Sequence, residues 1–151
     1  MKVFFSYSKT KNIDNELVKS IITESKTVVN DLEMIIIDPL EDTSNIPISQ
    51  KVLDGLKQAD LLIAEITCFI PNVMYEVGFM KASGKPVIFL NNPKLQKDAE
   101  DEQIRQYFSF INQKPGFLPS DIGDVEYLQY EKNSSYDYSI FKNRLNNLIK
   151  K

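Results

Sequence analysis

Glu76 is the residue of this sequence best placed to do chemistry. It falls in the first turns of a helix expected over 72–83, just beyond a strand expected over 61–66. At that end of a helix the peptide dipole and the free backbone amides favour an anion, so the carboxylate would stay ionised and could act as a nucleophile. The alternative is a glutamate that only complements the helix dipole, and the residue alone does not separate the two.

Carboxylates are the expected reactive groups because other catalytic side chains are missing. The chain has no histidine and one cysteine, Cys68. This excludes Ser-His and Cys-His catalytic pairs, the usual zinc sites and intrachain disulfides. Cys68 has apolar neighbours and no histidine to activate it, so we expect an inert thiol. The acidic run 98–102 is typical of a solvated face, and neither a metal nor another cofactor is expected.

The overall composition is that of an ordinary folded protein. Of the 151 residues, 42% are hydrophobic and 26% are charged, and the formal net charge is -3. This charge makes duplex nucleic acid a poor partner, because binding requires many Lys or Arg contacts to phosphates, whereas a single nucleotide is compatible. The longest apolar run, 61–66, is interrupted by Glu65 and is too short to span a bilayer. The first residues do not resemble a signal peptide, so we expect a cytoplasmic location.

Strand and helix patterns alternate along the chain. Short β-type runs occur at 3–7, 34–37, 61–66, 86–90 and 125–130. Helical spacing of apolar residues follows at 13–21, 52–60, 72–83 and 138–149. The alternation predicts one α/β domain over residues 1–151, doubly wound in three layers, with a mostly parallel sheet of about five strands, in the flavodoxin-like and TIR-like class.

In such a sheet, ligands bind beyond the carboxyl ends of the strands, and the candidate substrate-binding residues all lie at that edge. They are Ser6, Tyr7, Ser8, Lys9, Asp38, Phe69 and Asn72. We expect the segment 6–9 to hold phosphate or sugar, and Tyr7 or Phe69 to stack on a base or to orient Glu76. Lys9 is equally consistent with an ordinary solvated side chain.

Three segments around Glu76 resemble the nucleoside 2-deoxyribosyltransferase family and its nucleotide N-glycosidase relatives. They are ADLLIAEIT at 59–67, NVMYEVG at 72–78 and GKPVI at 84–88. The resemblance implies that Glu76, within the Tyr-Glu-aliphatic-Gly pattern, is the nucleophile at the anomeric carbon of the sugar. A carboxylate can stabilise or capture the oxocarbenium-like centre that forms as the base leaves. The implied function is cleavage or transfer at the N-glycosidic bond of a nucleoside or nucleotide.

The same resemblance implies roles for other positions. Glu65 and Asp60 both match family positions, but only Glu65 lies at the carboxyl edge of the sheet, so we expect Glu65 to assist catalysis and Asp60 to be structural. The family's aspartate that handles the nucleobase falls at Val52 in this chain. In the family a neighbouring subunit's C-terminus completes the pocket, which makes a homo-oligomer the expected state.

The opening of the chain bears a second resemblance, to TIR domains. It rests on VFFSYS at 3–8, on Ile37-Asp38 followed by a long loop, and on a helix that leads into Ala59-Asp60. In catalytic TIR domains a glutamate of the equivalent helix attacks or stabilises the nicotinamide ribose of NAD, and Glu76 again occupies that place. Two alternatives therefore stay open: a TIR-type NAD hydrolase or signal producer in bacterial antiviral defence, and a non-catalytic nucleotide-sensing or assembly module.

Overall fold

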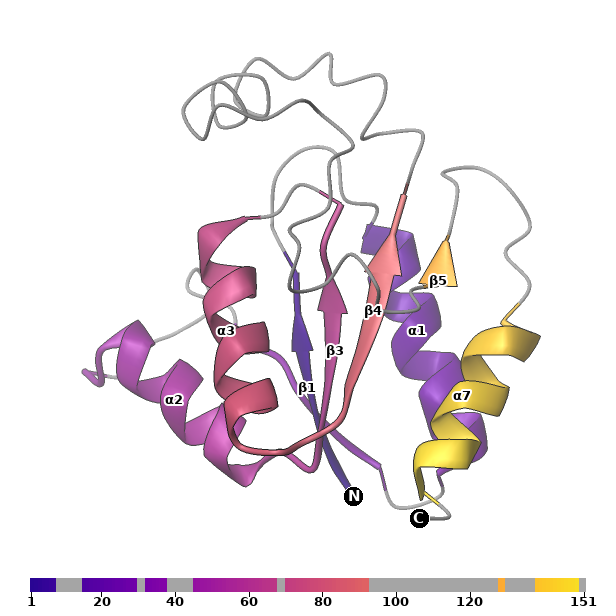
Figure 1. The fold of residues 1–151 in the computed structure, drawn as a ribbon, viewed down its shortest axis with the longest axis horizontal. Helices are drawn as coiled ribbons and strands as arrows, with labels where there is room; N and C mark the ends of the chain where they lie inside the picture. The colour runs from indigo at the N-terminus through magenta and orange to yellow at the C-terminus, as the bar shows by residue number, and fades with distance from the viewer. Residues whose placement is uncertain are drawn as a thin grey trace.

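A parallel sheet with helices on both faces forms the frame of the protein. The computed structural model describes residues 1–7, 15–29, 32–37, 45–67, 70–92, 128–129 and 138–149 (Figure 1). Within these ranges the strands are β1 (Lys2–Ser6), β2 (Glu33–Ile35), β3 (Leu61–Glu65), β4 (Val87–Asn91) and β5 (Leu128–Gln129). The helices are α1 (Asn15–Val28), α2 (Ile48–Gln58), α3 (Pro71–Ala82) and α7 (Ser139–Ile149). The strand order is β2-β1-β3-β4-β5 and every pair is parallel, which confirms the expected doubly wound fold.

The two faces of the sheet are covered by different helices (Figure 1). Helices α2 and α3 pack on one face, and α1 and α7 pack on the other. All residues of the central strand β3 are buried, because it has neighbours on both sides and helices above and below. Leu62 and Ala64 belong to the α2–α3 core, whereas Leu61 and Ile63 belong to the α1–α7 core. This two-sided burial explains the unbroken apolar run of the strand.

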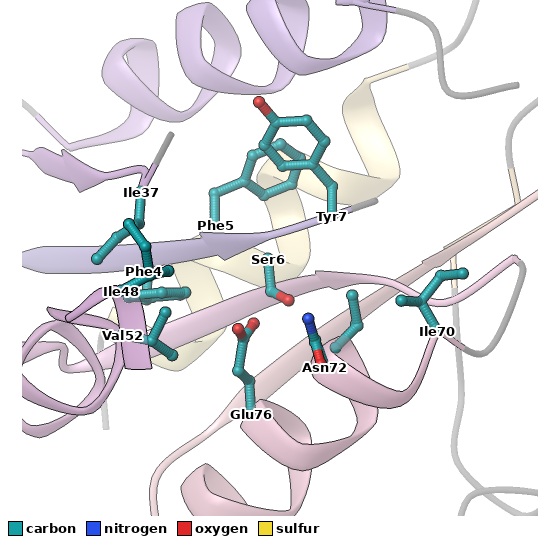
Figure 2. Close-up of a pocket in the computed structure, with 11 residues that line it drawn as sticks. Phe4, Phe5, Ser6, Tyr7, Ile37, Ile48, Val52, Ile70, Asn72 and Glu76 are labelled. Carbon is teal, nitrogen blue, oxygen red and sulfur yellow. The ribbon is translucent and has the colours of Figure 1, made fainter. Parts of the chain in front are cut away.

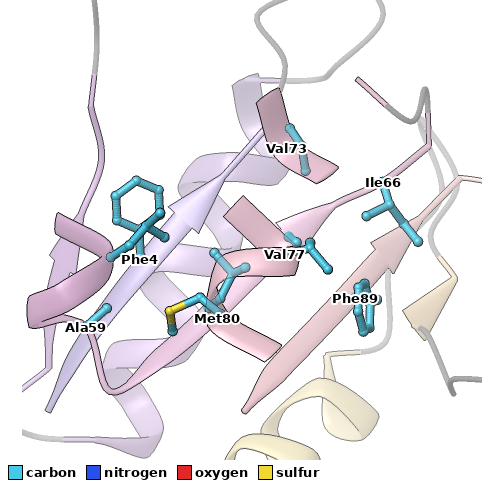
Figure 3. Packing of buried hydrophobic residues seen from close by; sticks show 10 residues of the cluster. Phe4, Ala59, Ile66, Val73, Val77, Met80 and Phe89 are labelled. Carbon is cyan, nitrogen blue, oxygen red and sulfur yellow. The ribbon is translucent and has the colours of Figure 1, made fainter. Parts of the chain in front are cut away.

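Helix α3 is fixed to the sheet by apolar side chains along its inner surface. Figure 3 shows Val73, Val77 and Met80 packed in one cluster with Phe4 of β1 and Phe89 of β4. These three helix residues are at most 2% exposed. Because they repeat at helical spacing, they fix the rotation of α3 about its axis. That rotation decides which way the remaining side chains of α3 point.

The turn between α3 and β4 lies at the amino edge of the sheet, opposite the predicted site. Gly84 adopts a φ of 68°, in the left-handed region where a side chain is strained, and ends α3 there. The ammonium group of the neighbouring Lys85 lies at the C-terminal end of α2. Its Nζ donates to the carbonyl oxygens of Leu56 at 3.1 Å, Lys57 at 2.7 Å and Ala59 at 2.7 Å. Lys85 therefore caps the C-terminus of α2, where a cation is favourable.

Asp60 also lies at the amino edge. Its carboxylate accepts a hydrogen bond from the backbone amide of Lys2 at 2.8 Å, and its own amide donates to the carbonyl of Lys2 at 2.8 Å. The residue joins the start of β3 to the start of β1.

No helix within the described ranges has the length and apolar character needed to cross a membrane.

Candidate active site

A cavity of about 250 Å³ opens at the carboxyl end of β1, between α2 and α3 (Figure 2). It is lined by residues of β1, α2, α3 and their connections, namely Phe4, Phe5, Ser6, Tyr7, Ile37, Ile48, Val52, Ile70, Asn72, Val73 and Glu76. β1 is followed by α1 on one face of the sheet, whereas the neighbouring strand β3 is followed by α3 on the other face. This change of side is the position where doubly wound sheets bind ligands.

Glu76 points from α3 into this cavity, toward Ser6 (Figure 2). The residue is 8% exposed. Burial raises the pKa of the Glu76 carboxyl above its ordinary value of 4.5, and a side-chain interaction with Ser6 lowers it in part. Glu76 lies in the second turn of α3, beyond the reach of the strongest dipole effect, so burial opposes the ionisation that the helix dipole was expected to favour.

Ser6 is the polar residue of β1 that faces Glu76. Phe4 belongs to the α2–α3 core, and strand alternation turns Ser6 to the same face. Ser6 is 3% exposed, and its Oγ has no partner at standard hydrogen-bond geometry among the described residues. Its interaction with the Glu76 carboxylate is looser than that geometry. A buried hydroxyl and a buried carboxyl thus meet at the cavity.

Two further predicted substrate-binding residues line the cavity. Asn72 is exposed in the first turn of α3, and Figure 2 shows its side chain beside Ser6 and Glu76. Tyr7 follows β1, and its ring stacks on that of Phe5 with 5.3 Å between the centroids and 24° between the planes. Both rings lie across β1 from Glu76 (Figure 2). Asn72 is therefore close to the carboxyl group, whereas the Tyr7 ring packs against the α1–α7 core on the other face of the sheet.

The wall of the cavity opposite α3 is apolar. Ile48 and Val52 stand one turn apart at the start of α2, and Ile37 extends this apolar surface from the chain after β2. Ile70, the N-cap residue of α3, adds an apolar side chain on the other side of the cavity. Val52 is the position where the family resemblance places an aspartate. Sequence reasoning missed this wall, although the spacing of four residues between Ile48 and Val52 was a usable signal of one shared helix face.

Glu65 does not line the cavity. Since Ala64 faces α2 and α3, alternation turns Glu65 to the face of α1 and α7, away from Glu76. Glu65 is 3% exposed, and its Oε1 accepts hydrogen bonds from the hydroxyl of Thr67 and from the Thr67 amide at 3.1 Å. The Thr67 Oγ1 accepts a hydrogen bond from the backbone amide of Asn92 at 2.8 Å. In this arrangement Glu65 helps to join the ends of β3 and β4.

The structure therefore brings together part of the predicted site. Ser6, Tyr7, Asn72 and Glu76 line one cavity, and Glu65 stands apart from it. Four predicted substrate-binding residues lie outside the described residues, namely Ser8, Lys9, Asp38 and Phe69. Cys68 also lies outside them. In the described part of the chain, no three acidic, cysteine or histidine side chains are grouped to hold a metal ion.

Comparison with known families accounts for the pattern around Glu76. The sequence model of the nucleoside 2-deoxyribosyltransferases matches residues 3–138. The chain belongs to this family. The matched range contains all of β1 but its first residue, the cavity wall of α2 and the whole of α3, and family members act on small nucleoside or nucleotide substrates. Membership in the nucleoside 2-deoxyribosyltransferase family thus indicates an enzyme of deoxyribosyl transfer or N-glycosidic cleavage.

One solved structure supports the fold, and two others are similar at lower TM-scores. A conserved protein from Enterococcus faecalis V583 is 18% identical, with a TM-score of 0.56 over 99% of this chain and 96% of that one. A 2-desoxiribosyltransferase from Leishmania mexicana is 18% identical, with a TM-score of 0.48 over 65% and 71%. The CMP N-glycosidase BcmB from Clostridium botulinum is 19% identical, with a TM-score of 0.45 over 96% and 98%. No curated protein matches the chain. The TIR resemblance receives no support from these comparisons.

Proposed function

We propose that the protein cleaves or transfers the N-glycosidic bond of a nucleoside or nucleotide, with Glu76 as the nucleophile. One observation supports this most strongly. In a chain of this family, a buried carboxyl group points into a cavity at the carboxyl edge of the sheet. Buried acids with a perturbed pKa in a cavity are typical of functional sites.

The reaction begins with the ionised form of Glu76. One carboxylate oxygen attacks the anomeric carbon, the C–N bond breaks, and its electron pair leaves with the base, which takes a proton from solvent. The result is a glycosyl ester on Glu76, as in retaining glycosidases. Attack by water on that ester gives hydrolysis, whereas attack by a second base gives transfer. In both cases the carboxylate is regenerated.

The lining of the cavity divides into two surfaces suited to the two halves of a nucleoside. Ile48 and Val52 offer an apolar wall for the flat face of a base, and Asn72 offers hydrogen bonds to sugar hydroxyls.

Base release tests the proposal. The purified protein is incubated separately with nucleosides, deoxynucleoside monophosphates and NAD, and free base is followed by chromatography. A second base is added in parallel, so that a new nucleoside reports transfer. We expect base from at least one nucleoside or mononucleotide, and its loss in Glu76→Gln. Glu65→Gln is the matched control, because it alters a buried glutamate that lies outside the cavity.

Two outcomes would replace the proposal with another function. Base release from NAD alone would identify an NAD hydrolase instead. Binding of nucleotides in calorimetry, with no base released from any substrate, would identify a nucleotide-sensing module. Full activity in Glu76→Gln would remove the mechanism even if the reaction class were right.

A further inference from the structure

We propose that Ser6 is a positioning residue for Glu76, whose hydroxyl donates a hydrogen bond to the carboxylate and holds it ionised and directed into the cavity. The part of this inference that concerns catalysis rests on the proposed function. The interaction between the two residues does not, because it follows from their burial and placement. Figure 2 shows the Ser6 hydroxyl and the Glu76 carboxyl pointing toward one another across the cavity.

The burial of Ser6 is the first reason. A hydroxyl that is removed from water costs free energy unless it finds a partner, and buried polar atoms without one are rare. Ser6 is 3% exposed, and its Oγ has no partner at standard hydrogen-bond geometry among the described residues. Its alternation with the core residue Phe4 leaves it no route to solvent on the opposite face. The carboxyl group of Glu76 is the acceptor that it faces.

The surroundings of Glu76 are the second reason. Helix α2 presents Ile48 and Val52, the chain after β2 presents Ile37, and the residue before α3 is Ile70, so these elements supply no hydrogen-bonding or charged side chain to the described cavity. Their apolar groups disfavour a carboxylate. A donor is needed to offset that effect.

Among the described lining residues, the other candidate donors are Tyr7 and Asn72. Tyr7 is the only other titratable group, and its ring stacks on Phe5 across β1 from Glu76 (Figure 2). Asn72 is exposed, so its amide is hydrated. Burial raises the pKa of Glu76, and Ser6 is the neighbour whose hydrogen bond lowers it. Ser6 is thus the donor that opposes burial.

The consequence concerns the fraction of Glu76 that can react. If the Ser6 hydroxyl is removed, burial acts without opposition, and Glu76 takes up its proton at a higher pH. The carboxylate also loses a contact that limits its side-chain rotamers. Both effects lower the rate of the chemical step more than they lower substrate binding, so kcat falls while KM changes little.

The direct experiment follows the Glu76 carboxyl by ¹³C NMR in protein labelled at the glutamate side chains, with Glu76→Gln used to assign its signal. The titration midpoint is measured in the wild type, Ser6→Ala, Ser6→Thr and Asn72→Ala. We expect the midpoint to move to higher pH in Ser6→Ala and to stay near the wild-type value in Ser6→Thr and Asn72→Ala. An unchanged or lowered midpoint in folded Ser6→Ala would overturn the proposal.

Kinetics supply the second readout on the same variants. Removal of one hydrogen bond to a charged group predicts a loss in kcat of about tenfold or more in Ser6→Ala, with the acid limb of kcat/KM displaced to higher pH. Ser6→Thr should regain most of the loss. A kcat and an acid limb unchanged in Ser6→Ala, in an active enzyme, would overturn the positioning role.

The NMR titration also separates this inference from the proposed function. If no substrate is turned over but the midpoint still moves in Ser6→Ala, the Ser6–Glu76 interaction stands and the assigned reaction fails. Should Ser6→Ala not fold, Ser6→Cys retains the shape with a weaker donor. Its midpoint is expected to lie above that of the wild type, and a midpoint equal to that of the wild type would contradict the proposal.

Discussion

The polar residues at the two edges of the sheet have opposite roles. At the amino edge, Lys85 donates to three carbonyl oxygens at the end of α2, and Asp60 is joined to the backbone of Lys2. At the carboxyl edge, Glu76 is buried among apolar side chains and faces a serine hydroxyl through a loose contact. The first edge uses its charges to hold backbone in place, whereas the second leaves a carboxyl group directed into a cavity.

This difference shows that not all residues of the family pattern belong to the reaction site. Gly84 and Lys85 belong to the same pattern as Glu76, yet they end α3 and cap α2 on the side away from the cavity. Their contribution to a reaction is indirect, through the stability of the helices that form the cavity. Substitutions at the two edges should therefore affect different measurements.

The largest effect is expected from Glu76→Gln. Loss of the nucleophile should lower kcat by at least about 10³-fold, with a folded protein, because no other carboxyl group lines the described cavity. Asp60→Asn is the matched control at the amino edge, where an amide also replaces a carboxylate. It should keep its turnover while losing about 1 kcal/mol of stability. Equal losses of turnover in the two variants would erase the distinction between the edges.

Lys85→Met should act on stability. The ammonium group satisfies carbonyl oxygens at the C-terminus of α2, so its removal should cost about 1.5–3 kcal/mol in the free energy of unfolding, measured with urea. Turnover per folded molecule at low temperature should be unchanged. Lys57→Met, on the last turn of the same helix, removes only an exposed ion pair at 4.0 Å and should cost little. A Lys85→Met protein as stable as Lys57→Met would contradict the capping role.

Two glycines test the packing that supports the cavity. A Cβ at Gly55 of α2 would lie 2.7 Å from a ring carbon of Phe4, so Gly55→Ala should force α2 from β1 and cost about 1–3 kcal/mol. A Cβ at Gly78 of α3 meets nothing within 4 Å, and Gly78→Ala should stabilise the helix by about 0.5–1 kcal/mol. Thermal unfolding of both variants measures the contrast. The same direction of change in both would refute the packing of α2 on β1.

The smallest effect concerns pH and stability. Because burial raises the pKa of Glu76 above 4.5, the folded protein binds the Glu76 proton more tightly than the unfolded chain does. Stability therefore falls as the pH rises through the raised pKa, and the loss remains above it. Glu76→Gln should be more stable than the wild type at neutral pH, with a difference that shrinks as the pH falls through the raised pKa toward 4.5 and levels off below 4.5. Urea unfolding of both proteins at neutral pH and at pH 4.5 measures this. A stability difference that is the same at the two pH values would contradict it.

The fold could be predicted from the sequence because its signals are local. The unbroken apolar run of β3 indicated a strand buried on both faces, and Gly84 indicated the end of α3. The beginning of α2 was harder to place: the helix starts at Ile48, whereas apolar spacing was recognised only from Val52. The first turn of α2 lines the cavity and does not pack in the main core. The apolar spacing that predicts a helix is therefore weak there.

The site could be predicted only in part, because its remaining features depend on how elements meet. Glu76 was found from its position after a strand and from the family pattern. That Glu65 faces away from it follows from strand alternation combined with the packing of helices on the two faces, which no single segment reveals. The rise in the pKa of Glu76 likewise comes from burial, to which apolar residues of α2 and of the chain after β2, far away in the sequence, contribute.

The central claim is that the Glu76 carboxylate attacks the sugar. Rapid quenching of the enzyme with a nucleoside that it turns over, followed by proteolysis and mass spectrometry, tests it most directly. The account predicts a glycosyl adduct on the peptide that contains Glu76, absent from Glu76→Gln and present in Asp60→Asn. An adduct on another residue, or base release by Glu76→Gln at the wild-type rate, would contradict it.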